Sequence, residues 1–338
     1  MFILGTIHDE NGHCKGMIGA ADRRTAWLPL PMLALFAVFG TLPAWIEAIG
    51  LYPYLGVEVM VWIIFGLGFN LLLGYSGLPS FGHGAYFGVG AYAFGLAQFH
   101  LYPNLWVCMA AAALAAALAG ALVALFISHR RGIYYALLTI AFGQIFWFVS
   151  VKWHSVTRGE DGLLNIKRLP ADFGVAAFDL GGLEALYWFA FAVFVVTVVL
   201  LWRLVHSPFG RVLVAIKQNE TRARFVGHHV WLYKWLAFTL SALIAGLAGG
   251  LFALAQQSAY PNVMSLQQSG FVVMMTLVGG GMVSFWGPVL GAVLFFVARD
   301  LLGAYTEAWL LWYGLLFMAV VLFKPEGLAG LLRWRRTG

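Results

Sequence analysis

Apolar runs separated by short polar segments occupy the chain from residue 27 to residue 323. Most runs are about 18 to 24 residues long, the length at which a helix crosses a bilayer, and they lack the two-residue alternation of a membrane β-barrel. We therefore expect an all-α polytopic membrane protein with about ten transmembrane helices, some of them short or broken. The predicted helices cover residues 27–49, 54–73, 80–98, 104–128, 133–151, 184–205, 235–256, 269–283, 286–303 and 308–323.

The composition agrees with a membrane location. Hydrophobic residues make up 62% of the 338 positions, charged residues only 10%, and the mean hydropathy is +0.85. Soluble proteins carry roughly a quarter charged residues, so this chain lies outside their range. The net charge of +6 raises the question of a nucleic-acid partner, but the basic residues flank apolar runs, so we expect no such partner. Cys14 and Cys108 are the only cysteines and give no reason to expect a disulfide framework.

The positions of the basic residues predict the orientation in the membrane. Most of the 20 Lys and Arg residues fall on one side if the N-terminus is cytoplasmic, and Arg299 lies in or near a span. The other side then keeps only Lys152, Arg158, Lys167 and Arg168. Because cytoplasmic loops carry an excess of Lys and Arg, we expect both termini in the cytoplasm. The predicted parts are an N-terminal tail (1–26), a transmembrane domain (27–323) and a C-terminal tail (324–338).

Two polar connections are longer than the others. The outer one, residues 152–183, balances its basic residues with four carboxylates and is a candidate docking surface for a partner protein. These carboxylates belong to Glu160, Asp161, Asp172 and Asp179. The inner connection, residues 206–233, is basic and amphipathic, so it predicts short helices outside the bilayer.

Glycine is concentrated in the segment "GYSGLPSFGHGAYFGVGAY", residues 74–92. Gly84, Gly88 and Gly95 share one helical face, which allows another backbone to approach closely. Gly74, Gly77 and Pro79 do not suit a continuous helix, so Tyr75 to Ser80 is predicted to form a break. The pattern recurs in "GGGMVSFWGPVLGAVLF", which begins with Gly279, Gly280 and Gly281. Two interpretations stay open: a plain packing interface, or helix breaks beside a substrate path.

Polar residues within the apolar runs are candidates for lining such a path. An uncharged side chain can bind a zwitterion or an amide without a buried fixed charge. The candidates are Asn70, Ser76, Ser80, His83, Gln98, Gln144 and Gln256. Glu58 is an ionisable group near a span end, and so are Arg299 and Asp300, which are neighbours in the sequence. Arg299 and Asp300 point to different helix faces, so the sequence does not require them to pair.

The sequence lacks the motifs of an enzyme. The phosphate loop G-x-x-x-x-G-K-[ST] does not occur, and neither does a His or Cys pattern typical of a metal site. The spans also lack a cluster of residues suited to catalysis. We therefore expect a chain that binds no cofactor or metal and catalyses no reaction.

Several motifs, taken in order, resemble the permease subunits of branched-chain amino acid ABC importers, more the LivM type than its LivH partner. They are the segment at 74–92, "RGIYYALLTIAFGQI" (131–145), "GEDGL" (159–163), "SPFGRVLVAIKQNETRARFVGHHVWLYKWLAF" (207–238), "GLAGGLFA", "LVGGGMVSFWGPVLGA" and "LLFMAVVLFKPEGLAG". The resemblance covers about residues 54 to 330. It implies a second, LivH-like permease, two cytoplasmic ATPases that use ATP and Mg, a periplasmic binding protein, and a multi-pass location in the bacterial inner membrane.

In that family, the loop similar to Glu220–Gly227 docks on the ATPase. Glu220, Ala223 and Gly227 match the family pattern, whereas Arg222 and Arg224 replace residues that are usually small or apolar. Together with Arg211 and Lys217, these residues form the predicted coupling loop.

The resemblance implies import of branched-chain or other hydrophobic amino acids. Permeases for urea, short amides or aromatic carboxylates are close relatives, and the sequence does not choose among these substrates. An ion-coupled secondary transporter is the alternative mechanism. It would need an acidic residue within the membrane, for which only Glu58 and Glu47 qualify.

Overall fold

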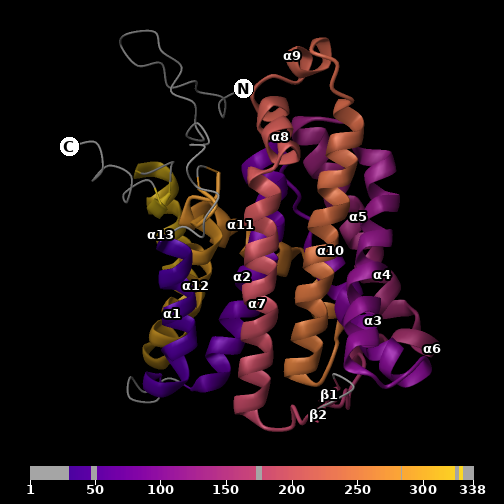
Figure 1. Cartoon of the computed structure of the whole chain (residues 1–338), viewed down its shortest axis with the longest axis vertical. Coiled ribbons are helices and arrows are strands. Elements are labelled where there is room, and N and C mark those ends of the chain that lie inside the picture. Colours follow the sequence, from indigo (N-terminus) through magenta and orange to yellow (C-terminus); the bar gives the residue numbers. More distant parts are fainter. Residues whose placement is uncertain (1–29, 47–51, 173–176, 283, 324–326, 330–338) are drawn as a thin grey trace.

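The computed structural model describes residues 30–46, 52–172, 177–282, 284–323 and 327–329. The predicted tail 1–26 lies outside these residues, as does most of the predicted tail 324–338. The elements, labelled in Figure 1 where there is room, are α1 (Leu30–Trp45), α2 (Pro53–Asn70), the π-helix η2 (Leu71–Ser76), α3 (Gly84–His100), α4 (Leu105–Ile127), α5 (Gly132–Lys152), α6 (His154–Thr157), the 3-10 helix η3 (Gly159–Asp161), β1 (Ala171–Asp172), β2 (Ala177–Phe178), α7 (Leu183–His206), α8 (Pro208–Gln218), α9 (Glu220–Phe225), α10 (Val230–Gln256), the 3-10 helix η4 (Pro261–Met264), α11 (Leu266–Gly279), α12 (Gly287–Tyr305) and α13 (Trp309–Phe323).

Each predicted span contains a helix. Among the described residues, six helical stretches are long and apolar enough to cross a membrane: Pro53–Ser76, Leu105–Ile127, Gly132–Lys152, Leu183–His206, Val230–Gln256 and Gly287–Ala304. α1, α11 and α13 are apolar but shorter. The helix in the seventh predicted span begins earlier than expected, because α10 starts at Val230.

The described residues are predominantly helical, as expected, with one short pair of strands. β1 and β2 pair antiparallel within the outer connection, with Ala171 opposite Phe178 and Asp172 opposite Ala177. Strands of two residues are too short to produce a periodic pattern in the sequence, so hydropathy did not reveal them.

Small residues bring α4 and α10 together. On α4, Ala112, Ala116 and Ala124 are buried, while Leu114, Leu118 and Leu122 on another face are 59%, 66% and 62% exposed. A Cβ atom at Gly246 of α10 would overlap Ala116. This arrangement is the one that a bilayer favours, because leucine gains nothing by leaving lipid whereas small side chains permit close helix packing.

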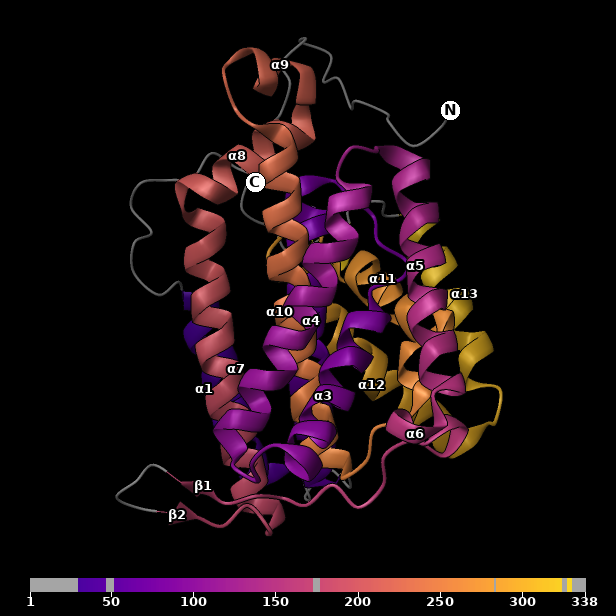
Figure 2. The ribbon, with the colours of Figure 1, turned by 90° about the vertical axis from the view of Figure 1, so that its right-hand side faces the viewer.

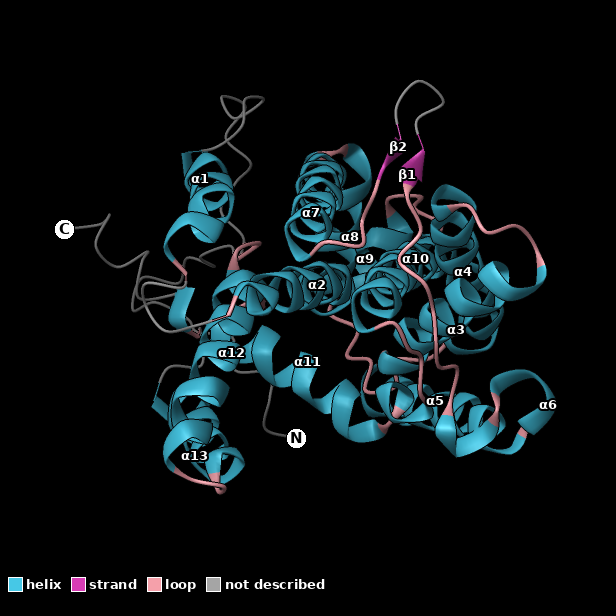
Figure 3. Cartoon of the chain, turned by 90° about the horizontal axis from the view of Figure 1, so that it is seen from below, coloured by secondary structure: helices cyan, strands magenta, loops and turns pink. Residues whose placement is uncertain are grey.

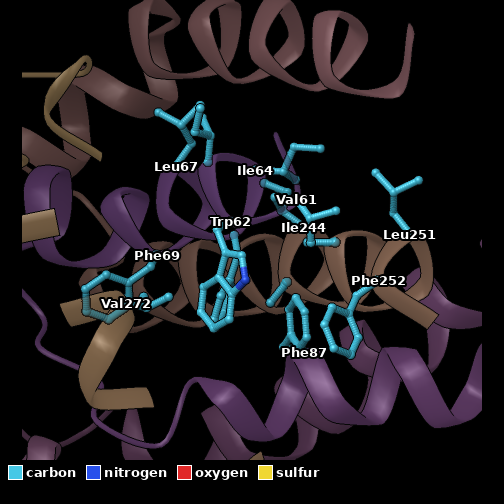
Figure 4. Packing of buried hydrophobic residues seen from close by; sticks show 14 of the residues in the cluster. Val61, Trp62, Ile64, Leu67, Phe69, Phe87, Ile244, Leu251, Phe252 and Val272 are labelled. Atoms are coloured by element: carbon cyan, nitrogen blue, oxygen red, sulfur yellow. The ribbon is translucent and has the colours of Figure 1, made fainter. Parts of the chain in front are cut away.

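The centre of the bundle is α2. Nearly all of its residues are buried, as expected for a helix that is apolar on every face. Seen from below, α1, α12 and α13 lie on one side of α2, and α3, α4 and α10 lie on the other (Figure 3). Trp62 of α2 stacks on Phe87 of α3, with 5.7 Å between ring centroids, and Phe252 of α10 continues this aromatic row (Figure 4).

The two long polar connections lie at opposite ends of the bundle. Figures 1 and 2 show α8 and α9 at one end, and α6, β1 and β2 at the other. The outer connection is bound to the helices by hydrogen bonds. Leu163 and Ala259 form a β-bridge, and the Gln98 amide both donates to the Lys167 carbonyl and accepts from its N–H, each at 2.9 Å.

Candidate functional site

The first glycine segment ends α2 differently from what the sequence predicts. The helix does not stop at Tyr75 but continues through Gly74 to Ser76 as the π-helix η2. It ends at Gly77, whose φ of +70° lies in the left-handed region that glycine adopts without strain. The helix therefore ends two residues later than the predicted break at Tyr75–Ser80, because the wider turns of the π-helix include Gly74.

The second glycine segment forms a similar helix end. α11 stops at Gly279, and Gly280 follows with φ +89°. The Gly281 N–H donates to the Thr276 carbonyl at 2.7 Å. This turn leads into α12, whose first residue packs so closely on Gly279 that a Cβ there would overlap the Gly287 carbonyl.

The two breaks touch each other. A Cβ at Gly74 would lie 2.6 Å from the Gly281 carbonyl oxygen, and a Cβ at Gly281 would lie 2.8 Å from Asn70 Oδ1. Asn70 also donates to the Ser284 carbonyl at 3.4 Å. Glycine is thus required at both positions for contact between the breaks.

Lys217 of α8 binds both breaks. Its Nζ donates to the Gly74 carbonyl at 2.7 Å and to the Met282 carbonyl at 3.1 Å. The stem of Lys217 crosses Gly77 closely, since a Cβ at Gly77 would lie 2.9 Å from Lys217 Cγ. Burial lowers the pKa of the Lys217 ammonium below its usual value of 10.5.

Glu220 begins α9 and is the centre of an ion-pair network. Its Oε2 lies 2.7 Å from Arg131 Nε and 2.7 Å from Lys234 Nζ, while its Oε1 lies 3.4 Å from Arg224. Lys234 has only 2% of its side chain exposed and Glu220 has 13%. The Asn219 side chain caps α9 by accepting from the Arg222 N–H at 2.9 Å. The network therefore fixes α9 to α10 and to the connection between α4 and α5.

The predicted coupling-loop residues divide into inner and outer groups. Ala223 is buried against Ile216 and Val230, and Lys217 and Glu220 also point inward. The exposed members are Arg211, Arg222, Arg224 and Gly227. A groove between α8 and α9 runs beside Arg222. Only the exposed group is accessible to another protein in this structure.

The structure places most candidate path residues inside packed regions. Asn70, Ser76, Ser80, His83 and Gln98 are buried, Gln144 is half-buried and Gln256 is exposed. His83 lies in an aromatic cage beside Phe65, and its Nε2 is 2.9 Å from Ser241 Oγ, which donates to the Gly68 carbonyl. Asn70 is the member that lies at the junction of the breaks.

The remaining predicted glycines form a packed stripe on α3. The Gly84 N–H donates to Ser269 Oγ at 2.9 Å. A Cβ at Gly88 would overlap Met264, and one at Gly95 would lie 2.9 Å from Ile166 Cδ1. This face of α3 therefore packs on η4, on α11 and on the outer connection.

At the outer end, the four carboxylates proposed for docking are exposed: those of Glu160, Asp161, Asp172 and Asp179. Near them, the backbone is held by specific bonds. Trp106 Nε1 donates to the Asp172 carbonyl at 2.8 Å, and Asp179 Oδ1 accepts from the Gly181 N–H at 2.9 Å.

Arg299 and Asp300, whose pairing the sequence does not require, do pair in the structure. Arg299 Nε lies 3.0 Å from Asp300 Oδ1, and the same guanidinium binds both oxygens of Glu58 at 2.8 and 2.9 Å. A guanidinium presents donors on two edges, so it reaches an adjacent carboxylate and a distant one together.

Sequence reasoning missed several residues of the site. Lys234 counted only toward the positive charge of the inner side, and Ser241 and Thr276 were not singled out. Lys234 had no signal in the sequence, because the predicted span began at residue 235, whereas α10 begins at Val230 and includes Lys234.

Long apolar helices, paired helix breaks and a basic helical segment at one end together define a multi-pass membrane permease. The chain belongs to the family described as branched-chain amino acid transport system, permease component, whose model matches residues 53–324.

Three curated relatives agree with this assignment. The high-affinity branched-chain amino acid transport system permease protein LivM of Salmonella typhimurium is 30% identical over 94% of this chain and 79% of its own length. LivM of Escherichia coli K12 is 32% identical over 81% of this chain and 69% of its own. A probable branched-chain amino acid transport permease protein LivM of Methanocaldococcus jannaschii is 25% identical over 37% of this chain and 41% of its own. No solved structure matches the chain.

Proposed function

We propose that the chain is the transmembrane permease subunit of an ATP-binding-cassette importer in the bacterial inner membrane. It forms the translocation path together with a second, LivH-like permease. Two cytoplasmic ATPases bind and hydrolyse ATP with Mg, and this chain binds neither. A periplasmic binding protein delivers branched-chain or other hydrophobic amino acids to the surface around Glu160 to Asp179. Ten transmembrane helices with both termini in the cytoplasm complete the proposed topology.

The observation that carries the proposal is the position and anchoring of α9. This helix stands at one end of the bundle (Figures 1 and 2) with Arg222 and Arg224 exposed, and Glu220 ties it to Lys234 of α10. A partner that pushes on α9 therefore moves α10, which packs against α2, α3 and α4. The family membership supports the same role.

The ion-coupled alternative has less support. Of the two acidic residues that it could use, Glu47 lies outside the described residues, and both carboxylate oxygens of Glu58 bind the Arg299 guanidinium. Because the guanidinium occupies both of these oxygens, neither is free to coordinate a sodium ion.

Reconstitution in liposomes with the partner permease, the ATPases and the binding protein tests the proposal. We expect solute-stimulated ATP hydrolysis with one class from a panel of amino acids, urea, short amides and aromatic carboxylates. Arg222→Glu, which reverses a charge on the exposed face of α9, should abolish the stimulation. Arg203→Met, which removes an exposed charge from the end of α7, should not. Solute uptake driven by an ion gradient without ATPases would contradict the proposal.

A further inference from the structure

A single side chain connects the helix next to the coupling surface with both helix breaks. Lys217 lies in α8, which is joined to α9 through Asn219 alone. Its ammonium reaches the Gly74 carbonyl in η2 and the Met282 carbonyl between α11 and α12. The two carbonyls come from segments that are far apart in the sequence but touch each other through Gly74 and Gly281.

These bonds satisfy backbone groups where regular structure ends. The last carbonyls of a helix lack partners within the helix, and at membrane depth such groups must be satisfied by protein or water. A bond from an ammonium is roughly twice as strong as a bond between neutral groups. Lysine suits this position because its compact ammonium carries donors that point in different directions, whereas the planar fork of arginine is rigid.

The backbone at the breaks is shaped to admit this side chain. Gly77 has no side chain, and the Lys217 stem passes through the space that a Cβ there would restrict. Other residues hold α8 itself in place: Leu213 and Ile216 are buried on its inner face, and Gly210 packs directly on the Val205 backbone. Lys217 therefore projects from a helix that is packed in place against the bundle.

We propose that Lys217 is a positioning residue that acts as a clasp: it transmits displacement of α8 to both helix breaks and so couples ATPase movement to opening of the inner end of the transport path. This inference rests on the proposed importer function. Glu220 transmits displacement of α9 to α10, and Lys217 transmits displacement of α8 to η2 and to the turn before α12. The breaks respond together because one ammonium holds both carbonyls.

Amide hydrogen exchange on the purified full chain tests the clasp without requiring transport. In Lys217→Met, which keeps an apolar stem and removes the ammonium, we expect exchange in residues 74–80 and 279–284 to increase about tenfold, as loss of a charged hydrogen bond implies. Exchange elsewhere should stay unchanged, and Arg203→Met should alter neither segment. Unchanged exchange at either break would overturn the clasp.

Reconstituted vesicles then test the coupling role through the ratio of solute imported to ATP hydrolysed. We expect Lys217→Met to keep solute-stimulated hydrolysis and to lower the ratio about tenfold. Proportional loss of uptake and hydrolysis, which a merely structural role produces, would overturn the coupling role, and so would an unchanged ratio. Should Lys217→Met fail to fold, Lys217→Gln serves as the second variant. Its neutral amide should lower the ratio partly, and full coupling would contradict the clasp.

Failure of the importer function has a different signature. Wild-type vesicles would then show no ATP-driven uptake, which would overturn the coupling role as well. The exchange experiment would still decide whether Lys217 holds the breaks.

Discussion

The Glu220 network permits a quantitative prediction about how α9 is held. Glu220→Gln removes the carboxylate while preserving the size of the side chain. Lys234, with 2% of its side chain exposed, then loses its charged partner. Arg131 and Arg224 also lose a partner, but their side chains are 50% and 65% exposed and solvent stabilises them.

The exposed fractions of these side chains decide the free-energy cost of each substitution. Removing one partner of a fully buried ion pair costs about 3 to 5 kcal/mol, and the partial exposure of Glu220 reduces this to about 2 kcal/mol. The two exposed pairs contribute about 0 to 1 kcal/mol each. Lys234→Met removes the buried charge itself and leaves Glu220 with both arginines, so it should cost less than Glu220→Gln. The double variant should resemble Lys234→Met.

Hydrogen exchange of residues 220–234 measures the effect locally, because a change of about 2 kcal/mol corresponds to about thirtyfold faster opening. A coupling free energy of about 2 kcal/mol between the two substitutions is the expected result of the double-mutant cycle. The reasoning is refuted if Glu220→Gln exchanges like the wild type in α9, or if the double variant is as destabilised as Glu220→Gln.

Three further predictions follow from other contacts. Raising the pH through the lowered pKa of Lys217 should reduce solute imported per ATP as the ammonium is lost, while global stability rises, because the unfolded chain then binds the extra proton. Lys217→Met should lack this part of the pH profile, and a profile identical to the wild type would exclude Lys217 as its source. Gly249→Ala should destabilise the fold by about 2 kcal/mol, because its Cβ would overlap the α3 backbone. Gly270→Ala, where a Cβ meets nothing within 4 Å, serves as the control in thermal unfolding, and equal melting temperatures would count against the packing argument. Glu58→Gln should leave ATP-driven uptake intact in vesicles without ion gradients, since Glu58 binds Arg299 and has no role in the proposed path; loss of uptake with normal folding would show that Glu58 takes part in transport.

The helices were the most predictable part of the structure. Burial in lipid demands long apolar stretches, so each span predicted from hydropathy contains a helix, and the two long polar connections lie between helices as expected. The start of α10 at Val230 was missed, because the charged Lys234 interrupts the apolar run there. The β1–β2 pair left no signal, because two residues do not establish a period.

The site was predictable in its parts but not in its contacts. The glycine patterns predicted both helix breaks, and the basic inner connection predicted the short helices α8 and α9. That Lys217 binds two carbonyls depends on how distant segments pack, which no local pattern encodes. The same reason explains why the sequence did not reveal the ion-pair network around Glu220, or the pairing of Arg299 with Glu58.

The β-bridge between Leu163 and Ala259 has a consequence for how a partner meets the outer surface. Because the Gln98 side chain of α3 and the backbone just after α10 both bind this connection, its carboxylates are held on a preformed platform. The proposed binding protein, on docking there, would lose little conformational entropy in ordering the connection, and this preorganisation favours binding. Association should then be governed by charge, with an on-rate that falls steeply as salt is raised, and a salt-independent on-rate would argue against this platform as the docking surface.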